Sequence, residues 1–223
     1  MIIYHGSKDI IKLPEYGKGN AQNDYGLGFY CTESIELAKE WACSDSETNG
    51  YANEYEIDLD SYDVLDLRED RYSILNWMAI LLKHRTFDVN NTVSLQAKDY
   101  LLEYFYVDVS RYDIIIGYRA DDSYFSFAKD FINNTISVSR LEEAMRLGEL
   151  GVQIVLKSQK AFDGLKYKGY KAAESKEYYV KKISRDKNAR ERYFNCIRGG
   201  SVVNDVFVVD IMRRGLKNGD KIL

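Results

Sequence analysis

The sequence predicts a mixed α+β fold. Short segments in which apolar residues run together or alternate with polar ones are typical of strands, and longer segments with apolar residues at helical spacing lie between them. The chain has 223 residues, of which 45% are hydrophobic and 30% charged, as expected of a globular domain with a sizeable core. Pro14 is the single proline, so no proline-rich linker indicates a domain boundary.

Four segments are expected to form strands, at 1–4, 53–59, 111–117 and 153–156. The first and last are short apolar runs, the second alternates polar and apolar residues, and the third contains three consecutive isoleucines. Because β-branched residues favour strands, the isoleucine run is expected to be an interior strand. Residues 14–28 carry four glycines and are expected to form a loop.

Helices are expected between these strands. Thr32 is a favourable N-cap for a helix that runs through Trp41. Residues 72–83 and 93–105 have their apolar side chains at helical spacing. The sequence Ser-Arg-Leu-Glu at 139–142 is a capping box, which predicts the start of a further helix at Ser139.

The C-terminal part is also expected to be helical. Asp121 or Asp122 is expected to cap a helix that runs through Phe131. Two more helical segments in the tail are separated by a pair of glycines at 199–200. Residues 1–223 are therefore expected to form a single domain, with 168–223 as its helical C-terminal extension.

The cysteine and histidine content argues against disulfide and metal chemistry. Cys31, Cys43 and Cys196 are odd in number and form no Cys-x-x-Cys pattern, so reduced thiols are expected. The chain has only two histidines, too few for a His-rich zinc site. His84 lies in a basic cluster at 83–85 and is expected to be a solvated residue at a helix end.

Neither a secretory signal nor a membrane span is visible in the sequence. The N-terminus lacks the positively charged region and the apolar run of a secretory signal. The longest strongly apolar stretch, at 78–82, is far too short to cross a bilayer. We therefore expect a cytoplasmic protein that has no membrane partner.

A basic strip at 157–192 stands out from the rest of the chain. It holds twelve Lys and Arg residues against five Asp and Glu, a local charge of +7 in a chain whose net charge is −4. A solvated face is one interpretation of such a strip, and a surface for an acidic partner is the other. Its four tyrosines would suit stacking on unpaired bases, but they are equally compatible with core positions or with docking of an inhibitory protein. These tyrosines are Tyr167, Tyr170, Tyr178 and Tyr179.

Two short motifs near the N-terminus bear on function. His5 ends an apolar strand, and Gly6 follows it, where a ligand can approach the backbone without meeting a Cβ. The second motif, Gly-Leu-Gly-Phe-Tyr at 26–30, lacks the later glycine and the βαβ setting of a dinucleotide fingerprint. Taken singly, each motif is also explained by structure alone, as a hydrogen-bonded strand-end histidine and a glycine turn.

As an ordered pair, the motifs resemble those of a known enzyme class. Tyr-His-Gly-Ser at 4–7 resembles the first-strand motif of ADP-ribosyltransferases of the diphtheria-toxin and poly(ADP-ribose) polymerase type. Residues 26–30 look like their Gly-x-Gly-x-Tyr element, and Trp41 falls where the polymerases have a second aromatic residue. The wider pattern, from Met1 to about Tyr167, is similar to an uncharacterised bacterial family of ADP-ribosyltransferase-like proteins.

The resemblance implies a fold and a nicotinamide pocket. The implied fold is α+β, with a split antiparallel β-sheet core and surrounding helices. The Gly6 backbone would pair with the nicotinamide carboxamide, and His5 would hydrogen-bond a ribose hydroxyl. Tyr30 and Trp41 would sandwich the cationic ring. The implied NAD⁺-binding residues are His5, Gly6, Ser7, Gly28, Tyr30 and Trp41.

One position departs from the pattern of that class. The glutamate that opens a later strand is replaced by Gln153, which can hydrogen-bond the ribose but carries no charge. Either the reaction is restricted to mono-ADP-ribosyl transfer, or Asp122, failing that Asp121, supplies the charge, or only binding remains. Both aspartates are explained as well by helix capping.

The expected activity is therefore that of an NAD⁺-dependent mono-ADP-ribosyltransferase with no metal cofactor. It would release nicotinamide and attach ADP-ribose to a protein or a nucleic acid, using His5, Tyr30, Gln153 and Asp122. The resemblance implies a toxin-like protein of a bacterial toxin–antitoxin or phage-conflict system, with a possible cognate antitoxin. The alternatives are a non-catalytic NAD or ADP-ribose-binding module and an interaction protein that uses the basic strip.

Overall fold

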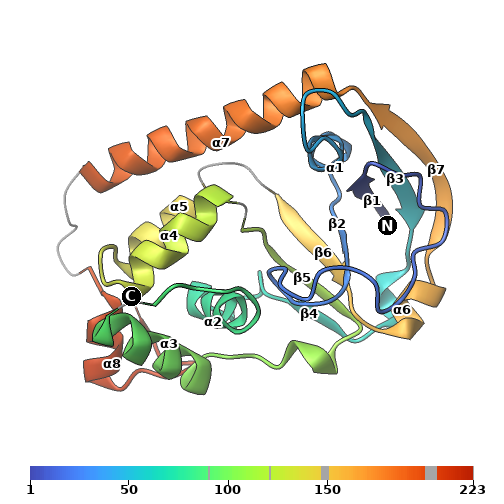
Figure 1. Cartoon of the computed structure of the whole chain (residues 1–223). Helices are drawn as coiled ribbons and strands as arrows, with labels where there is room; N and C mark the ends of the chain where they lie inside the picture. The colour runs from blue at the N-terminus through green and yellow to red at the C-terminus, as the bar shows by residue number, and fades with distance from the viewer. Residues whose placement is uncertain (90, 121, 147–150, 199–204, 223) are drawn as a thin grey trace.

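Two β-sheets and the helices around them make up this computed structural model, which describes residues 1–89, 91–120, 122–146, 151–198 and 205–222 (Figure 1). The strands are β1 (Ile2–Ser7), β2 (Phe29–Cys31), β3 (Gly50–Glu56), β4 (Val64–Asp66), β5 (Ile114–Tyr118), β6 (Val152–Leu156) and β7 (Lys166–Ala173). The helices are α1 (Ile35–Ala42), α2 (Ile74–His84), α3 (Thr92–Tyr104), α4 (Asp122–Ile132), α5 (Val138–Arg146), α6 (Gln159–Asp163), α7 (Ser175–Arg198) and α8 (Val208–Arg214). The expected α+β class is confirmed.

The sheet is split, as the sequence resemblance implied. One sheet has the order β1-β3-β7 and is antiparallel throughout. The other has the order β2-β6-β5-β4, in which only the β4–β5 pair is parallel among the described strands. A single bridge between Tyr4 and Thr32 joins β1 to the chain just after β2.

The second sheet is buried on both faces, which explains its continuous apolar runs. Ile114 and Ile116 of β5 pack in the cluster between the two sheets, together with Ile3 of β1. Ile115 points the other way, into the large cluster formed with helices α2–α5, α7 and α8. Because successive side chains of a strand point to opposite faces, a run of three isoleucines is what a doubly covered strand requires.

Two predicted helix starts were displaced by a few residues. Ser34 rather than Thr32 caps α1, with its Oγ accepting from the Leu37 N–H, because Thr32 is held in the bridge to Tyr4. In α5, Ser139 lies inside the helix, and Ser137 accepts from the Arg140 N–H at 3.3 Å. Capping patterns therefore located these helices, while tertiary contacts decided which hydroxyl forms the cap.

The C-terminal extension is not purely helical. The expected boundary at 168 falls within β7, which pairs with β3 along its length and contains a bulge. Helix α7 begins at Ser175 and crosses from α1 to α4 and α5 (Figure 1). Helix α8 packs against α3.

The loop at 14–28 is fixed to the second sheet by buried polar contacts. Tyr25 is fully buried and donates its hydroxyl to the Tyr118 carbonyl at 2.6 Å. Lys157 follows β6 and donates to the carbonyls of Tyr25 and Leu27. Burial lowers the pKa of the Lys157 ammonium to about 8. These contacts hold the loop against the edge of the cavity described below.

Gly26 provides a test of how tightly this loop is packed. It has φ 74°, and an added Cβ would lie 2.7 Å from His84 Nδ1. Gly17, in the same loop, has φ 80° but nothing within 4 Å of the added Cβ. We expect Gly17→Ala to cost about 1–2 kcal/mol from the left-handed backbone alone. Gly26→Ala should cost a further ~1–3 kcal/mol from overpacking.

Urea denaturation of the two variants measures both free energies of unfolding. Equal losses for Gly17→Ala and Gly26→Ala would show that the loop moves to accommodate the added methyl group and that His84 does not clash with it.

Candidate functional site

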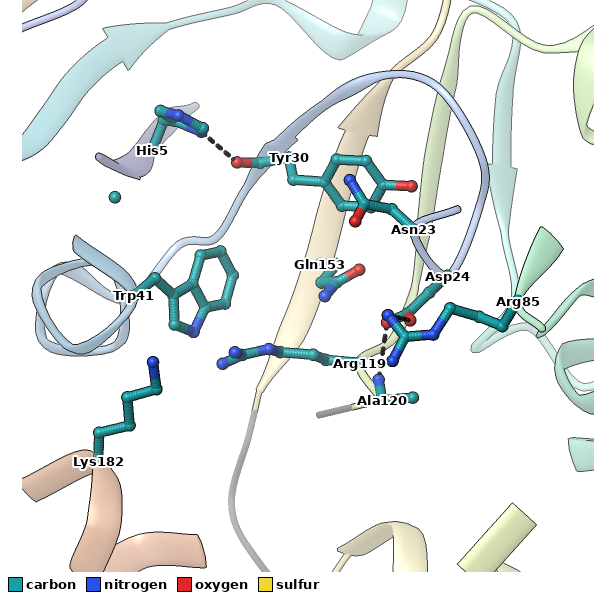
Figure 2. Close-up of a pocket in the computed structure, with 11 residues that line it drawn as sticks. His5, Asn23, Asp24, Tyr30, Trp41, Arg85, Arg119, Ala120, Gln153 and Lys182 are labelled. Carbon is teal, nitrogen blue, oxygen red and sulfur yellow. Dashed lines mark hydrogen bonds and ion pairs between the residues drawn. The ribbon is translucent and has the colours of Figure 1, made fainter. Parts of the chain in front are cut away.

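A cavity of about 360 Å³ lies where the two sheets diverge, between β1, β2, β6 and helices α1 and α7. This volume is within the range of about 300–1,000 Å³ typical of small-molecule sites. Its lining residues are brought together from both sheets, three loops and two helices (Figure 2). They are His5, Gly6, Asn23, Asp24, Tyr30, Trp41, Arg85, Arg119, Ala120, Gln153 and Lys182.

Gly6 presents its peptide groups to the cavity side of β1. Tyr4 exchanges both of its backbone hydrogen bonds with Thr32, at 2.8 and 2.9 Å, so its N–H and C=O point away from β3. Alternate residues of an antiparallel strand direct these groups to the same side, so Gly6 does likewise. Helix α1 approaches Gly6 so closely that a Cβ would lie 2.0 Å from the Ala38 carbonyl oxygen. Packing on α1 alone therefore requires glycine here.

His5 is held as a neutral imidazole with a defined tautomer. Its Nδ1 lies 2.7 Å from the Tyr30 carbonyl oxygen, which can only accept, so Nδ1 carries the proton. Burial lowers the pKa of His5, and the hydrogen bond to Tyr30 opposes this only partly. The ring stacks on Phe29 with centroids 4.2 Å apart. Nε2 is consequently a hydrogen-bond acceptor.

The two predicted aromatic residues line the same cavity from different elements (Figure 2). Tyr30 is fixed by its hydroxyl, which donates to the Gly26 carbonyl at 2.5 Å and accepts from the Tyr25 N–H at 3.1 Å. Trp41 comes from the end of α1, and the Arg119 guanidinium lies 4.5 Å from its ring centroid. The Trp41 Nε1 is buried and has no hydrogen-bond partner among the described residues.

Gln153 is the buried polar side chain in the wall of the cavity. It is 6% exposed, and its Oε1 finds no hydrogen-bond partner in the described part of the chain. Tyr30 pairs with Val155 two residues along β6, so the side chains of Tyr30 and Gln153 leave the same face of the sheet. An unpaired buried acceptor costs about 1–3 kcal/mol, a cost that a donor on a ligand would remove.

A second group of polar residues lines the opposite end of the cavity. Asp24 is 4% exposed, accepts from the Ala120 N–H at 2.8 Å and lies 3.6 Å from the Arg85 guanidinium. The 14–28 loop is thereby tied to the end of β5 and to the residue after α2. Figure 2 shows these contacts on the side of the cavity away from His5.

Helix α7 completes the cavity and is joined to α1 by a buried ion pair. Glu40 is 3% exposed and accepts from both Nε and Nη2 of Arg185, at 2.9 and 2.8 Å. Lys182, one turn earlier on α7, lines the cavity beside Trp41 (Figure 2).

The structure brings most of the predicted site residues together. His5, Gly6, Tyr30, Trp41 and Gln153 all line the cavity, and Ser7 and Gly28 do not. The Ser7 hydroxyl accepts from the Asp9 N–H at 3.1 Å. Gly28 packs on β6, where a Cβ would lie 2.7 Å from a Val155 methyl carbon.

The predicted carboxylates lie outside what the structure describes. Asp121 is not among the described residues, and Asp122 begins α4 while its side chain is outside the description. Sequence reasoning missed the polar lining residues Asn23, Asp24, Arg85, Arg119 and Lys182. Asn23, Asp24, Arg85 and Arg119 lie in loops or at helix ends, where the sequence shows no pattern, and Lys182 belongs to the basic strip.

His84 ends α2 as expected, but it is half-buried and not fully solvated, contrary to the sequence-based expectation. Its Nε2 is buried with no hydrogen-bond partner in the described residues. Burial, with smaller contributions from the charges of Lys157 and Lys83, lowers the His84 pKa to about 4. The imidazole is therefore neutral at pH 7 and packs under Gly26 because the 14–28 loop covers this end of α2.

The basic strip is spread over α6, β7 and α7, and many of its charges are paired. Ion pairs join Lys160 to Asp113, Lys168 to Glu56, Lys181 to Glu36 and Glu177, Arg185 to Glu40, Lys187 to Glu191 and Arg190 to Asp186. Tyr178 is buried, whereas Tyr170 is 48% exposed. One residue of the strip, Lys182, lines the cavity.

The Glu40–Arg185 pair is expected to stabilise the junction of α1 and α7. Glu40→Gln leaves the guanidinium without its charge partner, at a cost of about 3 kcal/mol, the lower end for buried pairs because the Arg185 side chain is 27% exposed. Glu36→Gln, on the same helix but 52% exposed, should cost less than about 1 kcal/mol. Chemical denaturation compares the two, and similar losses would mean that the buried pair does not hold α7 in place.

The described residues contain no group of three or more His, Cys, Asp or Glu side chains placed to hold a metal ion. Within the same residues, no helix combines the length and apolar character needed to cross a membrane. Comparison with curated proteins and with solved structures gave no match. Residues 1–167 match the sequence profile of a family described as "Protein of unknown function (DUF3990)". The chain belongs to the DUF3990 family, whose matched region ends within β7, before α7 begins.

Proposed function

We propose that the cavity binds NAD⁺ and that the protein transfers ADP-ribose from it to a macromolecule, with release of nicotinamide. The observation that carries this proposal is the convergence of five residues on one cavity: His5, Gly6, Tyr30, Trp41 and Gln153. Their motifs resemble those of diphtheria-toxin and poly(ADP-ribose) polymerase type ADP-ribosyltransferases, and this resemblance implies a role in NAD⁺ binding or transfer for each of them.

The end of the cavity near β1 suits a nicotinamide group. A carboxamide both donates and accepts hydrogen bonds, and Gly6 offers one N–H and one C=O on the cavity side of its strand. Tyr30 and Trp41 supply aromatic surfaces to the same cavity. A cationic pyridinium ring gains electrostatic stabilisation from stacking on such surfaces.

His5 and Gln153 suit the hydroxyl groups of the adjoining ribose. The neutral His5 has its Nε2 available as an acceptor, because Nδ1 donates to Tyr30. Gln153 has an unpaired buried Oε1 in the same cavity. Both are acceptors, and a sugar hydroxyl can donate to each of them.

In the proposed reaction the bond between the ribose carbon and the nicotinamide nitrogen breaks, and its electron pair leaves with nicotinamide. The acceptor's nucleophile forms the new bond to that carbon, and its proton passes to solvent. Positive charge develops on the ribose, and a carboxylate normally stabilises it. Gln153 offers only the dipole of its amide, so we propose that Asp122, failing that Asp121, supplies the charge.

A binding-only module is the second candidate, and the neutral Gln153 favours it. Asp24, the carboxylate that lines the described cavity, is held by the Ala120 N–H and by Arg85. It is thus engaged in fixing the loop. Binding without transfer would make the protein a reader of NAD⁺ or ADP-ribose.

The setting we propose is that of a toxin-like bacterial protein with a protein or nucleic-acid acceptor. A cognate antitoxin is the partner that this setting implies, and the exposed charges of the basic strip are available to an acidic partner.

Incubation of the protein in a bacterial lysate with NAD⁺ labelled in its adenylate phosphate tests the proposal. We expect nicotinamide release together with a labelled macromolecule that either protease or nuclease removes, which identifies the acceptor class. Binding of NAD⁺ without nicotinamide release supports the binding module instead. Absence of NAD⁺ binding refutes both.

Tyr30→Ala is expected to weaken NAD⁺ binding by a stacking loss of about 1–3 kcal/mol, by analogy with base stacking on aromatic residues. Tyr30→Phe is the matched control, since it keeps the ring and removes only the hydroxyl contacts to Gly26 and Tyr25. Calorimetric titration with NAD⁺ separates the two. If Tyr30→Phe weakens binding as much as Tyr30→Ala, the hydroxyl acts by shaping the loop and the ring does not stack.

Gln153→Glu is expected to raise the rate of nicotinamide release. A carboxylate at this position adds charge stabilisation that is worth about 2.7–4 kcal/mol when it acts on the transition state. The double variant Gln153→Glu with Asp122→Asn shows whether Asp122 already supplied that charge. A double variant that binds NAD⁺ but releases nicotinamide no faster than Asp122→Asn alone contradicts the proposed position of the ribose.

A further inference from the structure

Among the described residues that line the cavity, cations outnumber carboxylates. Three cations line it, Arg85, Arg119 and Lys182, against the single described carboxylate of Asp24. Arg85 is paired with that carboxylate at 3.6 Å. The Arg119 guanidinium lies 4.5 Å from the Trp41 ring centroid, and Lys182 lines the same cavity (Figure 2).

Lys182 differs from its neighbours on α7. Lys181 pairs with Glu36 and Glu177, and Arg185 pairs with Glu40. No carboxylate among the described residues forms an ion pair with Lys182, which is half-buried and lines the cavity. The Lys182 side chain is therefore placed to pair with an anionic group of a ligand in the cavity.

The position of Lys182 is fixed by the pair that anchors its helix. Arg185 lies one turn further along α7 and is bound by both carboxylate oxygens of Glu40, the residue before Trp41. The same contact therefore fixes the backbone that carries Lys182 relative to the backbone that carries Trp41. An aromatic surface and a cationic group in one cavity suit a ligand that has a flat ring and an anion joined by a short linker.

We infer that Arg119 and Lys182 form an anion subsite that takes the diphosphate of a nucleotide. Guanidinium and ammonium groups are the usual protein partners of phosphate oxygens, the first by paired hydrogen bonds and the second as a point charge. The identification of the nucleotide as NAD⁺ rests on the proposed function, whereas the anion subsite does not.

Part of the subsite lies outside the family match. Arg119 is within residues 1–167, and Lys182 belongs to α7, which follows them. The region beyond the match therefore contributes directly to ligand binding in this chain, in addition to covering α1.

Titration of Lys182→Gln tests the inference, with Lys181→Gln as the matched control on the neighbouring, ion-paired lysine. Three probes are titrated separately at low and high salt: NAD⁺, inorganic pyrophosphate and nicotinamide. We expect Lys182→Gln to bind NAD⁺ and pyrophosphate about tenfold more weakly, with a smaller salt dependence than the wild type. Lys181→Gln should behave as the wild type, and nicotinamide affinity should be the same in all three proteins. Lys182→Arg should retain most of the affinity for both anions.

The outcomes separate the subsite from the proposed function. If wild type and Lys182→Gln bind NAD⁺ and pyrophosphate equally, the subsite is refuted and NAD⁺ binding stands. If pyrophosphate binds in a Lys182-dependent way and NAD⁺ does not bind, the subsite stands for another diphosphate and the proposed function fails. If neither probe binds the wild type, both are refuted. Circular dichroism and the melting temperature show that each variant is folded.

Discussion

The divergence of the two sheets beyond the bridge between Tyr4 and Thr32 determines the rest of the site. β1 is paired with β3 along its whole length, but on its other side Tyr4 alone forms backbone hydrogen bonds to other described residues, to Thr32 in the segment after β2. Because backbone groups require partners, a strand with one open side must face water, a ligand or a side chain. Here that open side faces the cavity, and Gly6, which packing on α1 requires to be a glycine, presents its peptide groups there.

Burial fixes the charge states of the groups around this cavity. His5 and His84 both have lowered pKa values because burial disfavours the imidazolium ion, and Lys157 is shifted in the same sense. Of these groups, His5 lines the cavity, where it is a neutral acceptor at the β1 end. Lys182 lines the same cavity from α7, so a ligand with a polar end and an anionic end would find a partner for each.

Helix α7 shows how a segment outside the family match becomes part of the site. It contacts α1, α4 and α5, so it links the helix that carries Trp41 to the helical layer on the second sheet. The ion pair between Glu40 and Arg185 restricts the packing of the two helices more than an apolar contact does, because each charge requires the other in a defined geometry. The pair therefore fixes the position of α7 along α1 as well as stabilising the contact.

The sequence by itself determined the fold class, most helices and the main residues of the cavity. Strong local signals made this possible: the isoleucine run of β5, the helical spacing of α2 and α3, and the ordered motifs around His5 and Tyr30. Short strands such as β2 and β4 had too few residues to show a period. The sequence did not predict β7, because this edge strand is mostly exposed and its polar and apolar residues alternate only weakly.

Only the tertiary structure decided which polar residues join the cavity and which charges remain unpaired. Asp24, Arg85 and Lys182 come from a loop, a helix end and a distant helix, and no local pattern links them. Likewise, the sequence predicts a solvated His84 because it lies in a basic cluster, whereas in the structure the 14–28 loop packs against its ring. Local sequence sets backbone preference and amphipathic pattern, whereas desolvation and ion pairing depend on which segments meet. That information resides in long-range packing.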